Sequence, residues 1–235
     1  SLVRAAQACR DLALAYRTPF ISGKDSLYNE YAHDGKSLAI PPTLLISAIG
    51  QVPDVRRCTT MDFKAAGNRL VVLGTTRLEF GGSLWALARG LDGGDAPTVD
   101  AAAGLATFRA LHRAIRDGLV RSCHDLSEGG LAVALAESAF AGRFGAEVSL
   151  RDVPRDDRAG SDAALLFSET PSRFLLEVEP ARYDALARAL DGLPFAAIGE
   201  TTAAPRLAID GLDGRRVIDA PLDELEAAWR RPLDW

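Results

Sequence analysis

The chain has 235 residues, of which 48% are apolar and 25% are charged, and its formal net charge is −5. These values suit one large soluble domain or one and a half. The acidic balance argues against a nucleic-acid surface, and no apolar run is long enough to span a bilayer. The first residues lack the layout of a signal peptide, and three scattered cysteines indicate reduced thiols in a cytoplasmic protein.

The first 53 residues predict one helix and two strands. Residues 2–17 are rich in Ala, Leu and Arg, which is typical of a helix, and Thr18-Pro19 ends it. Residues 20–22 predict a short strand. The nearly all-apolar residues 43–52 predict a buried strand.

The remaining residues predict strands and helices that alternate irregularly. Because several strands follow one another directly, the pattern favours an α+β fold with a mixed sheet over a regular doubly wound one. A charged, Pro-containing surface loop is expected at 151–162. The expected strands are 57–64, 68–76, 119–123, 173–179, 195–201, 205–211 and 215–220, and the expected helices are 80–90, 98–117, 129–141, 161–169, 180–191 and 221 onward.

The clearest local motif is CHDLSEGGLAVALAE, which starts at Cys123. An apolar strand ends there, a polar turn follows, and two glycines open a helix. A carboxylate at a strand end can hold Mg²⁺, and the free N–H groups of a helix start attract phosphate. An equally weighted alternative is that Asp125 or Ser127 merely caps the helix and that the glycines allow close packing. The residues in question are His124, Asp125, Ser127, Glu128, Gly129 and Gly130.

A second polar motif, SGKDSLYNEY, covers residues 22–31. Gly23, Lys24, Asp25 and Ser26 offer a flexible backbone, a cation, a carboxylate and a hydroxyl, which together suit a phosphorylated ligand and its metal ion. The second glycine of a P-loop is missing. The alternative interpretation is a solvated hairpin loop.

Three smaller features have structural interpretations that we favour. Cys123 beside His124 could be a nucleophilic thiol, but a buried strand-end cysteine is the better interpretation. Ser83 in EFGGS is expected to be a helix N-cap rather than part of a phosphate site. Glu169 and Arg173 are expected to form a surface ion pair.

Four motifs occur in an order that resembles a known family. They are TPFISGKDSLYNEY with IPPTLLISAIGQV, LGTTRLEFGGS, HDLSEGGLAVALAE and LFSETPSRFLLEV. Together they resemble the C-terminal part of the synthase subunit of phosphoribosylformylglycinamidine synthases, within the aminoimidazole ribonucleotide synthetase-like superfamily. The resemblance implies that residues 1–53 end a dimerising N-terminal subdomain that faces substrate and ATP. Residues 54–235 would form the C-terminal domain, with a mixed sheet and packed helices.

The resemblance also implies an activity. The family uses ATP and glutamine-derived ammonia to convert formylglycinamide ribonucleotide to the amidine. The implied cofactors are ATP and Mg²⁺, and the implied partners are that substrate, a glutaminase subunit or domain, and the rest of the synthase subunit. No nucleic acid or membrane is implied. One alternative is a non-catalytic lobe that holds a nucleotide and is inactive alone. Another is a related synthetase or a selenophosphate or thiamine-phosphate kinase, which the SGKDSLYNE motif does not fit.

The family's functional residues transfer to this chain position by position. Gly23 matches a glycine that touches ATP, and Ser26 matches a serine that contacts substrate. Asp125 matches a Mg²⁺ ligand and Ser127 a residue that holds an auxiliary nucleotide. Three further candidates are Asp25 as a secondary metal ligand, Lys24, which stands where small-type members have a metal-binding Asn, and His124. No catalytic residue is implied, and Glu169-Thr170-Pro171 only partly matches the family's Glu-Ser-Gln substrate motif.

Overall fold

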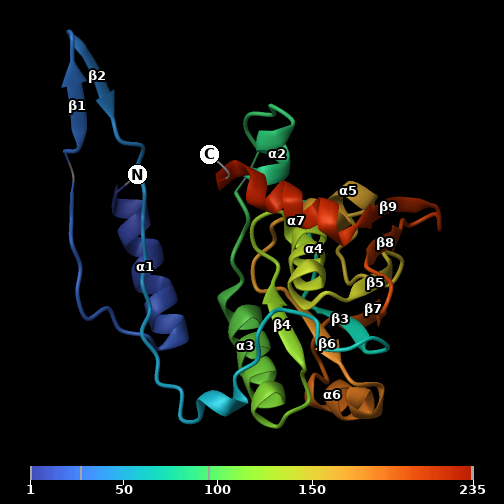
Figure 1. Cartoon of the computed structure of the whole chain (residues 1–235). Helices are drawn as coiled ribbons and strands as arrows, with labels where there is room; N and C mark the ends of the chain where they lie inside the picture. The colour runs from blue at the N-terminus through green and yellow to red at the C-terminus, as the bar shows by residue number, and fades with distance from the viewer. Residues whose placement is uncertain (1, 27, 95, 234–235) are drawn as a thin grey trace. The chain divides into compact units, whose positions relative to one another are not determined.

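A computed structural model describes residues 2–26, 28–94 and 96–233 of the chain. These residues form two compact units, Ser1–Pro53 and Asp54–Trp235 (Figure 1). We describe each unit by itself. Their assignment to an N-terminal and a C-terminal subdomain stays a prediction.

The first unit contains the helix α1 (Leu2–Tyr16) and a hairpin of β1 (Glu30–His33) and β2 (Lys36–Ala39). The helix agrees with the predicted one, but none of its described residues is buried. The hairpin turns at Asp34-Gly35, where both residues have positive φ angles of 50° and 71°. This Asp-Gly turn matches the twist of the two antiparallel strands. The Asp-Gly pair is thus the local sequence signal for this hairpin.

Three predicted strands are wrong. Residues 20–22 and 43–52 are irregular, and Ile49 is 92% exposed. A strand forms only when a neighbouring strand accepts and donates its backbone hydrogen bonds, and within the described part of this unit residues 43–52 have no such neighbour. In the second unit, residues 57–64 form the end of a short 3₁₀ turn, η1 (Val55–Arg57), and an irregular segment.

The second unit is built on a seven-stranded sheet in the order β4-β6-β3-β7-β5-β8-β9. All neighbouring strands are antiparallel except β5 and β8, which are parallel, so the predicted mixed sheet is confirmed. The strands are β3 (Arg69–Leu73), β4 (Ser122–Asp125), β5 (Gly145–Ser149), β6 (Phe174–Val178), β7 (Phe195–Thr202), β8 (Arg206–Asp210) and β9 (Arg216–Pro221).

Helices cover both faces of this sheet, as Figure 1 shows. The α+β class is therefore confirmed. The α-helices are α2 (Leu84–Ala88), α3 (Ala101–Arg116), α4 (Gly130–Gly142), α5 (Asp162–Phe167), α6 (Tyr183–Ala189) and α7 (Leu222–Arg230), and the 3₁₀ turns are η2 (Pro180–Arg182) and η3 (Arg231–Leu233).

The central strand β3 explains why the sheet needs cover on both faces. Its residues alternate between two apolar clusters: Leu70 and Val72 pack with α4, α5 and α7, whereas Val71 and Leu73 pack with α3 and α6. Successive side chains of a strand point to opposite faces, so this continuous apolar run buries both faces, as predicted for residues 68–76. In the portion of the chain covered by the structure, none of the helices is long and apolar enough to cross a membrane.

Candidate functional site

The strand–turn–helix motif lies at the edge of the sheet in the second unit. Strand β4 is an edge strand and pairs with β6, which brings Asp125 opposite Phe174. The backbone N–H of Leu126 then donates to the carbonyl oxygen of Arg173 at 3.0 Å. A cleft of about 400 Å³ opens here, and Asp125, Ser127, Glu128, Glu169 and Arg173 are among the residues that line it.

Asp125 presents an ionised carboxylate to this cleft. Its side chain is 62% exposed. Partial burial raises its pKa, but the Ser127 hydroxyl, a backbone N–H and His124 outweigh that effect, so the pKa lies below its ordinary value. The carboxylate is therefore charged at neutral pH and open to solvent, which are two properties of a Mg²⁺ ligand.

His124 has a positioning role in the structure. Its side chain is only 14% exposed, and its Nε2 lies 2.8 Å from Oε2 of Glu137 on α4. Its Nδ1 lies 3.4 Å from Oδ1 of Asp125. The other oxygen of Glu137 accepts a hydrogen bond from Nε1 of Trp229 on α7 at 3.1 Å. The Glu137 carboxylate thus connects β4, α4 and α7. His124 itself is not among the residues that line the cleft.

The two glycines of the turn are required by packing. Gly129 and Gly130 have φ angles of +78° and +65°, a region that favours glycine. A Cβ atom on Gly130 would lie 2.6 Å from the carbonyl oxygen of Ser168 and 2.8 Å from that of Leu166. The backbone of α4 therefore starts in direct contact with the end of α5. This supports the close-packing interpretation of the motif.

Glu169 supplies an anion to the start of α4. Its Oε1 accepts hydrogen bonds from the backbone N–H groups of Gly129 and Leu84, both at 2.8 Å. The same carboxylate thus lies at the N-termini of α4 and α2, where a negative charge is favourable. Ser83 caps α2 as predicted, since its hydroxyl accepts from Ala86 N–H at 3.2 Å. Sequence reasoning missed this role of Glu169.

The predicted surface ion pair between Glu169 and Arg173 is wrong, because Arg173 is 1% exposed. Its guanidinium donates to the carbonyl oxygen of Thr170 at 3.0 Å, to the hydroxyl of Thr76 at 2.9 Å and to the carbonyl oxygen of Ser168. Burial lowers its pKa to about 10, although the charges of Glu79 and Glu169 act in the opposite direction. Arg173 therefore holds the loop 168–172 on the end of β3.

Cys123 is partly buried and precedes the polar turn in the chain. Burial, together with the charge of Asp125, raises the pKa of its thiol to about 12. A thiol with that pKa has almost no thiolate at neutral pH, so it is not an activated nucleophile. Cys123 is a partly buried cysteine in strand β4 that packs against the core, which supports the structural interpretation over the nucleophilic one.

The second polar motif, in the first unit, is exposed along its described length. Lys24 Nζ donates to the Ser26 hydroxyl at 2.6 Å and to the carbonyl oxygen of Asp25. Nothing lies within 4 Å of a Cβ atom added to Gly23. Leu27 lies outside the described residues. The roles predicted for these four residues stay predictions.

A metal site made of three or more His, Cys, Asp or Glu side chains is not found within residues 2–26, 28–94 and 96–233. Mg²⁺ does not require such a cluster, because it usually keeps several waters and binds one or two carboxylates together with phosphate oxygens. Asp125 at the open end of β4 fits that pattern. Glu128 is exposed in the same turn.

Comparisons with known proteins agree with this geometry. Residues 65–211 match the family described as AIR synthase related protein, C-terminal domain. The chain is 39% identical over 241 aligned positions to the phosphoribosylformylglycinamidine synthase subunit PurL of Deinococcus radiodurans. This alignment covers 99% of the chain and 31% of that relative. The chain thus spans about a third of the length of that relative.

Solved structures show the same fold. Thermotoga maritima PurL complexed with FGAR matches 73% of this chain and 30% of its own, with a TM-score of 0.65 and 21% identity. The same protein complexed with ATP matches 73% and 27%, with a TM-score of 0.62 and 20% identity. At these identities the likeness establishes the fold.

Proposed function

Through residues 65–211 the chain belongs to the family described as AIR synthase related protein, C-terminal domain, and we propose that it is a nucleotide-binding part of a phosphoribosylformylglycinamidine synthase. The observation that carries this proposal is the 39% identity to the PurL subunit over 99% of the chain. The whole enzyme would be an ATP-dependent ligase of purine biosynthesis. It would use formylglycinamide ribonucleotide and ammonia from a glutaminase subunit or domain, and the rest of the synthase subunit would complete the site.

The charges around the cleft support a nucleotide that binds with Mg²⁺. Three carboxylates, on Asp125, Glu128 and Glu169, face one guanidinium, that of Arg173, among the described residues that line the cleft. The net charge of −2 repels a free polyphosphate. A divalent cation on Asp125 would reverse this repulsion and bridge the carboxylate to phosphate oxygens. Ser127, which is exposed beside Asp125, would donate its hydroxyl to a phosphate oxygen.

The motif of the first unit would serve the substrate side. Gly23 would allow a phosphate to approach its backbone, and Ser26 would offer its hydroxyl to the substrate. Lys24 would supply positive charge, with Asp25 as a secondary metal ligand. The support for these roles is the resemblance of SGKDSLYNEY to the family motif and the open space around Gly23.

A holding role for the cleft in the second unit competes with a catalytic one. The site's histidine is bonded to Glu137, its thiol has a raised pKa, and the start of α4 already holds the Glu169 carboxylate. These contacts favour a lobe that binds nucleotide and supports the catalytic part of the enzyme. Phosphate release from ATP in the presence of ammonium and formylglycinamide ribonucleotide distinguishes the roles. Turnover by the chain alone at about 10 s⁻¹, an ordinary enzyme rate, would contradict the holding role.

Calorimetric titration of the chain with ATP tests nucleotide binding. We expect binding with Mg²⁺ and none with excess EDTA. Asp125→Asn keeps the size of the side chain and removes the charge that the metal needs, so it should abolish Mg²⁺-dependent binding.

The matched control is Asp213→Asn, which removes a carboxylate paired with Arg215 in the turn before β9. It should leave the titration unchanged. Equal ATP binding by both variants would show that Asp125 is only a polar turn residue, and EDTA-resistant binding would exclude the metal-bridged arrangement.

A further inference from the structure

A second pocket, separate from the cleft at Asp125, lies at the C-terminal end of α3. It has a volume of about 430 Å³ and shares none of the described residues with that cleft. Three segments form it: the chain after Asp54, the connection from α3 to β4, and Arg182 at the end of the 3₁₀ turn η2 before α6. Five arginines line it, namely Arg56, Arg57, Arg116, Arg121 and Arg182.

The ion pairs of the pocket leave an excess of positive charge. Asp54 pairs with both Arg56 and Arg57, at 2.8 Å and 3.8 Å. Glu179 likewise pairs with two arginines, Arg121 at 3.4 Å and Arg182 at 3.0 Å.

Within the described part of the chain, Arg116 alone of the five pairs with a carboxylate that it does not share with another of them, since Asp117 lies 3.1 Å from it. Five guanidinium groups therefore face three carboxylates, and the pocket has a net charge of +2. The chain as a whole has a net charge of −5, so this pocket opposes the overall sign.

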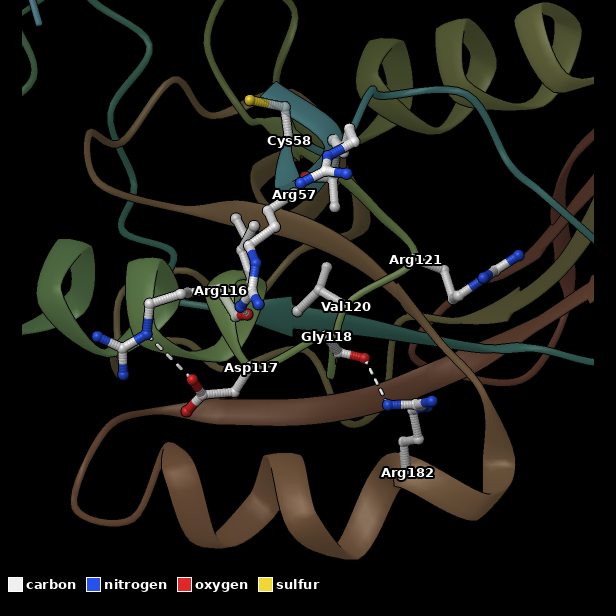
Figure 2. Close-up of a pocket in the computed structure, with 11 residues that line it drawn as sticks. Arg57, Cys58, Arg116, Asp117, Gly118, Val120, Arg121 and Arg182 are labelled. Atoms are coloured by element: carbon white, nitrogen blue, oxygen red, sulfur yellow. Dashed lines mark hydrogen bonds and ion pairs between the residues drawn. The ribbon is translucent and has the colours of Figure 1, made fainter. Parts of the chain in front are cut away.

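Two of the arginines are held in place by backbone contacts. Arg57 donates from Nη1 to the carbonyl oxygen of Arg116 at 3.0 Å, and Arg182 donates from Nη1 to that of Gly118 at 2.9 Å. Figure 2 shows both side chains reaching toward the segment around Gly118, with Val120 between them. In the same view Arg116 and Arg121 point outward on either side.

Helix capping explains only part of this arrangement. The carbonyl oxygens at the end of α3 need donors, and cations are favourable there. Arg57 and Arg182 meet that need with one N–H each, whereas a guanidinium has five. Arg56 and Arg121 are not needed for capping, and their charges repel those of their neighbours. A ligand that neutralises the excess would relieve this repulsion.

We propose that this pocket binds a small molecule that carries a phosphate group. A phosphate dianion matches the net charge of +2, and the planar guanidinium fork suits bidentate contacts to its oxygens. The volume lies within the range of small-molecule sites and leaves room for an organic group beside the phosphate. Ile115 and Val120 provide an apolar wall for that group. The proposal does not depend on nucleotide binding at Asp125.

The pocket carries its own reporter, because the exposed Cys58 lines it. Alkylation of Cys58 can be followed by mass spectrometry of the 235-residue chain at constant ionic strength. The probes are inorganic phosphate, ribose 5-phosphate and, as the uncharged counterpart, ribose. We expect both phosphates to slow the alkylation of Cys58 in a saturable way and ribose to have no effect. Protection by inorganic phosphate alone would restrict the site to the free ion.

The double variant Arg57→Gln/Arg182→Gln should weaken this protection roughly 10- to 100-fold. The matched control is Arg215→Gln/Arg230→Gln, which removes the same charge from exposed arginines elsewhere in the unit and should keep the affinity. If circular dichroism shows that the first double variant is misfolded, Arg121→Gln takes its place. Arg121 pairs with the side chain of Glu179 rather than with the carbonyl oxygens that Arg57 and Arg182 cap. Equal affinity in the pocket and control variants, or no protection by either phosphate, would overturn the proposal.

Discussion

Residues 22–31 and residues 124–130 have similar polar compositions, but the structure fixes them very differently. The motif at 124–130 begins in strand β4 of the seven-stranded sheet. Glu169, Glu137 and Arg173 hold its surroundings through hydrogen bonds of 2.8–3.1 Å. The motif at 22–31 is exposed along its described length, and the side chain of Lys24 bonds only to the next two residues, Asp25 and Ser26. The motif in the sheet is therefore shaped by its own unit. Within the described residues, the exposed motif has only these local side-chain bonds.

This difference separates two kinds of consequence for a substitution. In the turn at 124–130, a change is expected to alter the stability of the fold as well as binding. In the stretch 22–31, a change is expected to alter binding alone. The free energy of unfolding of the chain, measured by urea denaturation with tryptophan fluorescence, tests the comparison directly.

The largest loss is expected for Arg173→Met. Its guanidinium is buried and donates to Thr170, Thr76 and Ser168. Removing it strands these acceptors, so the free energy of unfolding should fall by about 3–5 kcal/mol. The control Arg230→Met, at an exposed pair with Glu226, should change it by less than about 0.5 kcal/mol. A similarly small change in both variants would mean that the contacts of Arg173 do not stabilise the surroundings of the motif at 124–130.

Gly130→Ala should follow, with a loss of roughly 2–4 kcal/mol from an unfavourable φ angle and from contacts of 2.6 Å and 2.8 Å with backbone oxygens. Gly23→Ala is the matched test in the other motif, because its new methyl group would meet nothing within 4 Å. Its effect should stay below about 0.5 kcal/mol. Equal losses at the two glycines would remove the distinction between the motifs.

Glu169→Ala should cost about 1–2 kcal/mol. It leaves the N–H groups of Gly129 and Leu84 without their acceptor. Glu169→Gln keeps an acceptor oxygen and should cost about half as much. If the amide variant were as unstable as the alanine variant, the negative charge rather than the hydrogen bond would be the stabilising feature.

Asp125→Asn should change the free energy of unfolding at pH 7 by less than about 1 kcal/mol, because the carboxylate is largely exposed. Its pKa is lowered in the folded protein, so its contribution is present above the unfolded value of about 3.9 and is lost as the pH falls below it. The wild-type protein should therefore lose slightly more stability than the variant as the pH falls below about 4, the unfolded value. Urea denaturation of both proteins at a series of acidic pH values measures this difference. An identical dependence of stability on pH in the two proteins would contradict a lowered pKa for Asp125.

Lys24→Ala should have the smallest effect on stability, below about 0.5 kcal/mol, since its bonds are local and exposed. In the full-length synthase of the proposed function, it should lower kcat/KM by roughly 10-fold or more if the ammonium group contacts a ligand in the transition state. Melting curves and steady-state kinetics on the same preparations separate the two effects. Unchanged kinetics would leave Lys24 as solvated surface.

The sequence predicted those parts of the fold that depend on neighbours in the chain. The apolar run of β3 and the small-residue helix after Gly129-Gly130 were found because their periods and their glycines are local signals. The strand at 43–52 was wrong because burial depends on a partner strand, which no local pattern encodes. Glu169 was missed because its two acceptor contacts reach 40 and 85 residues along the chain.

The exposed apolar residues of 43–52 also bear on how this chain behaves in a test tube. Residues 44–49 read Leu-Leu-Ile-Ser-Ala-Ile, without a charge or a proline, and Leu45 is 88% exposed. Six-residue segments of this kind stack into cross-β fibrils when they are accessible in many copies. Natural proteins often interrupt or flank such segments with charged residues that hinder aggregation, and residues 44–49 contain none. Concentrated solutions of the chain are therefore expected to aggregate through residues 44–49 unless these residues are covered.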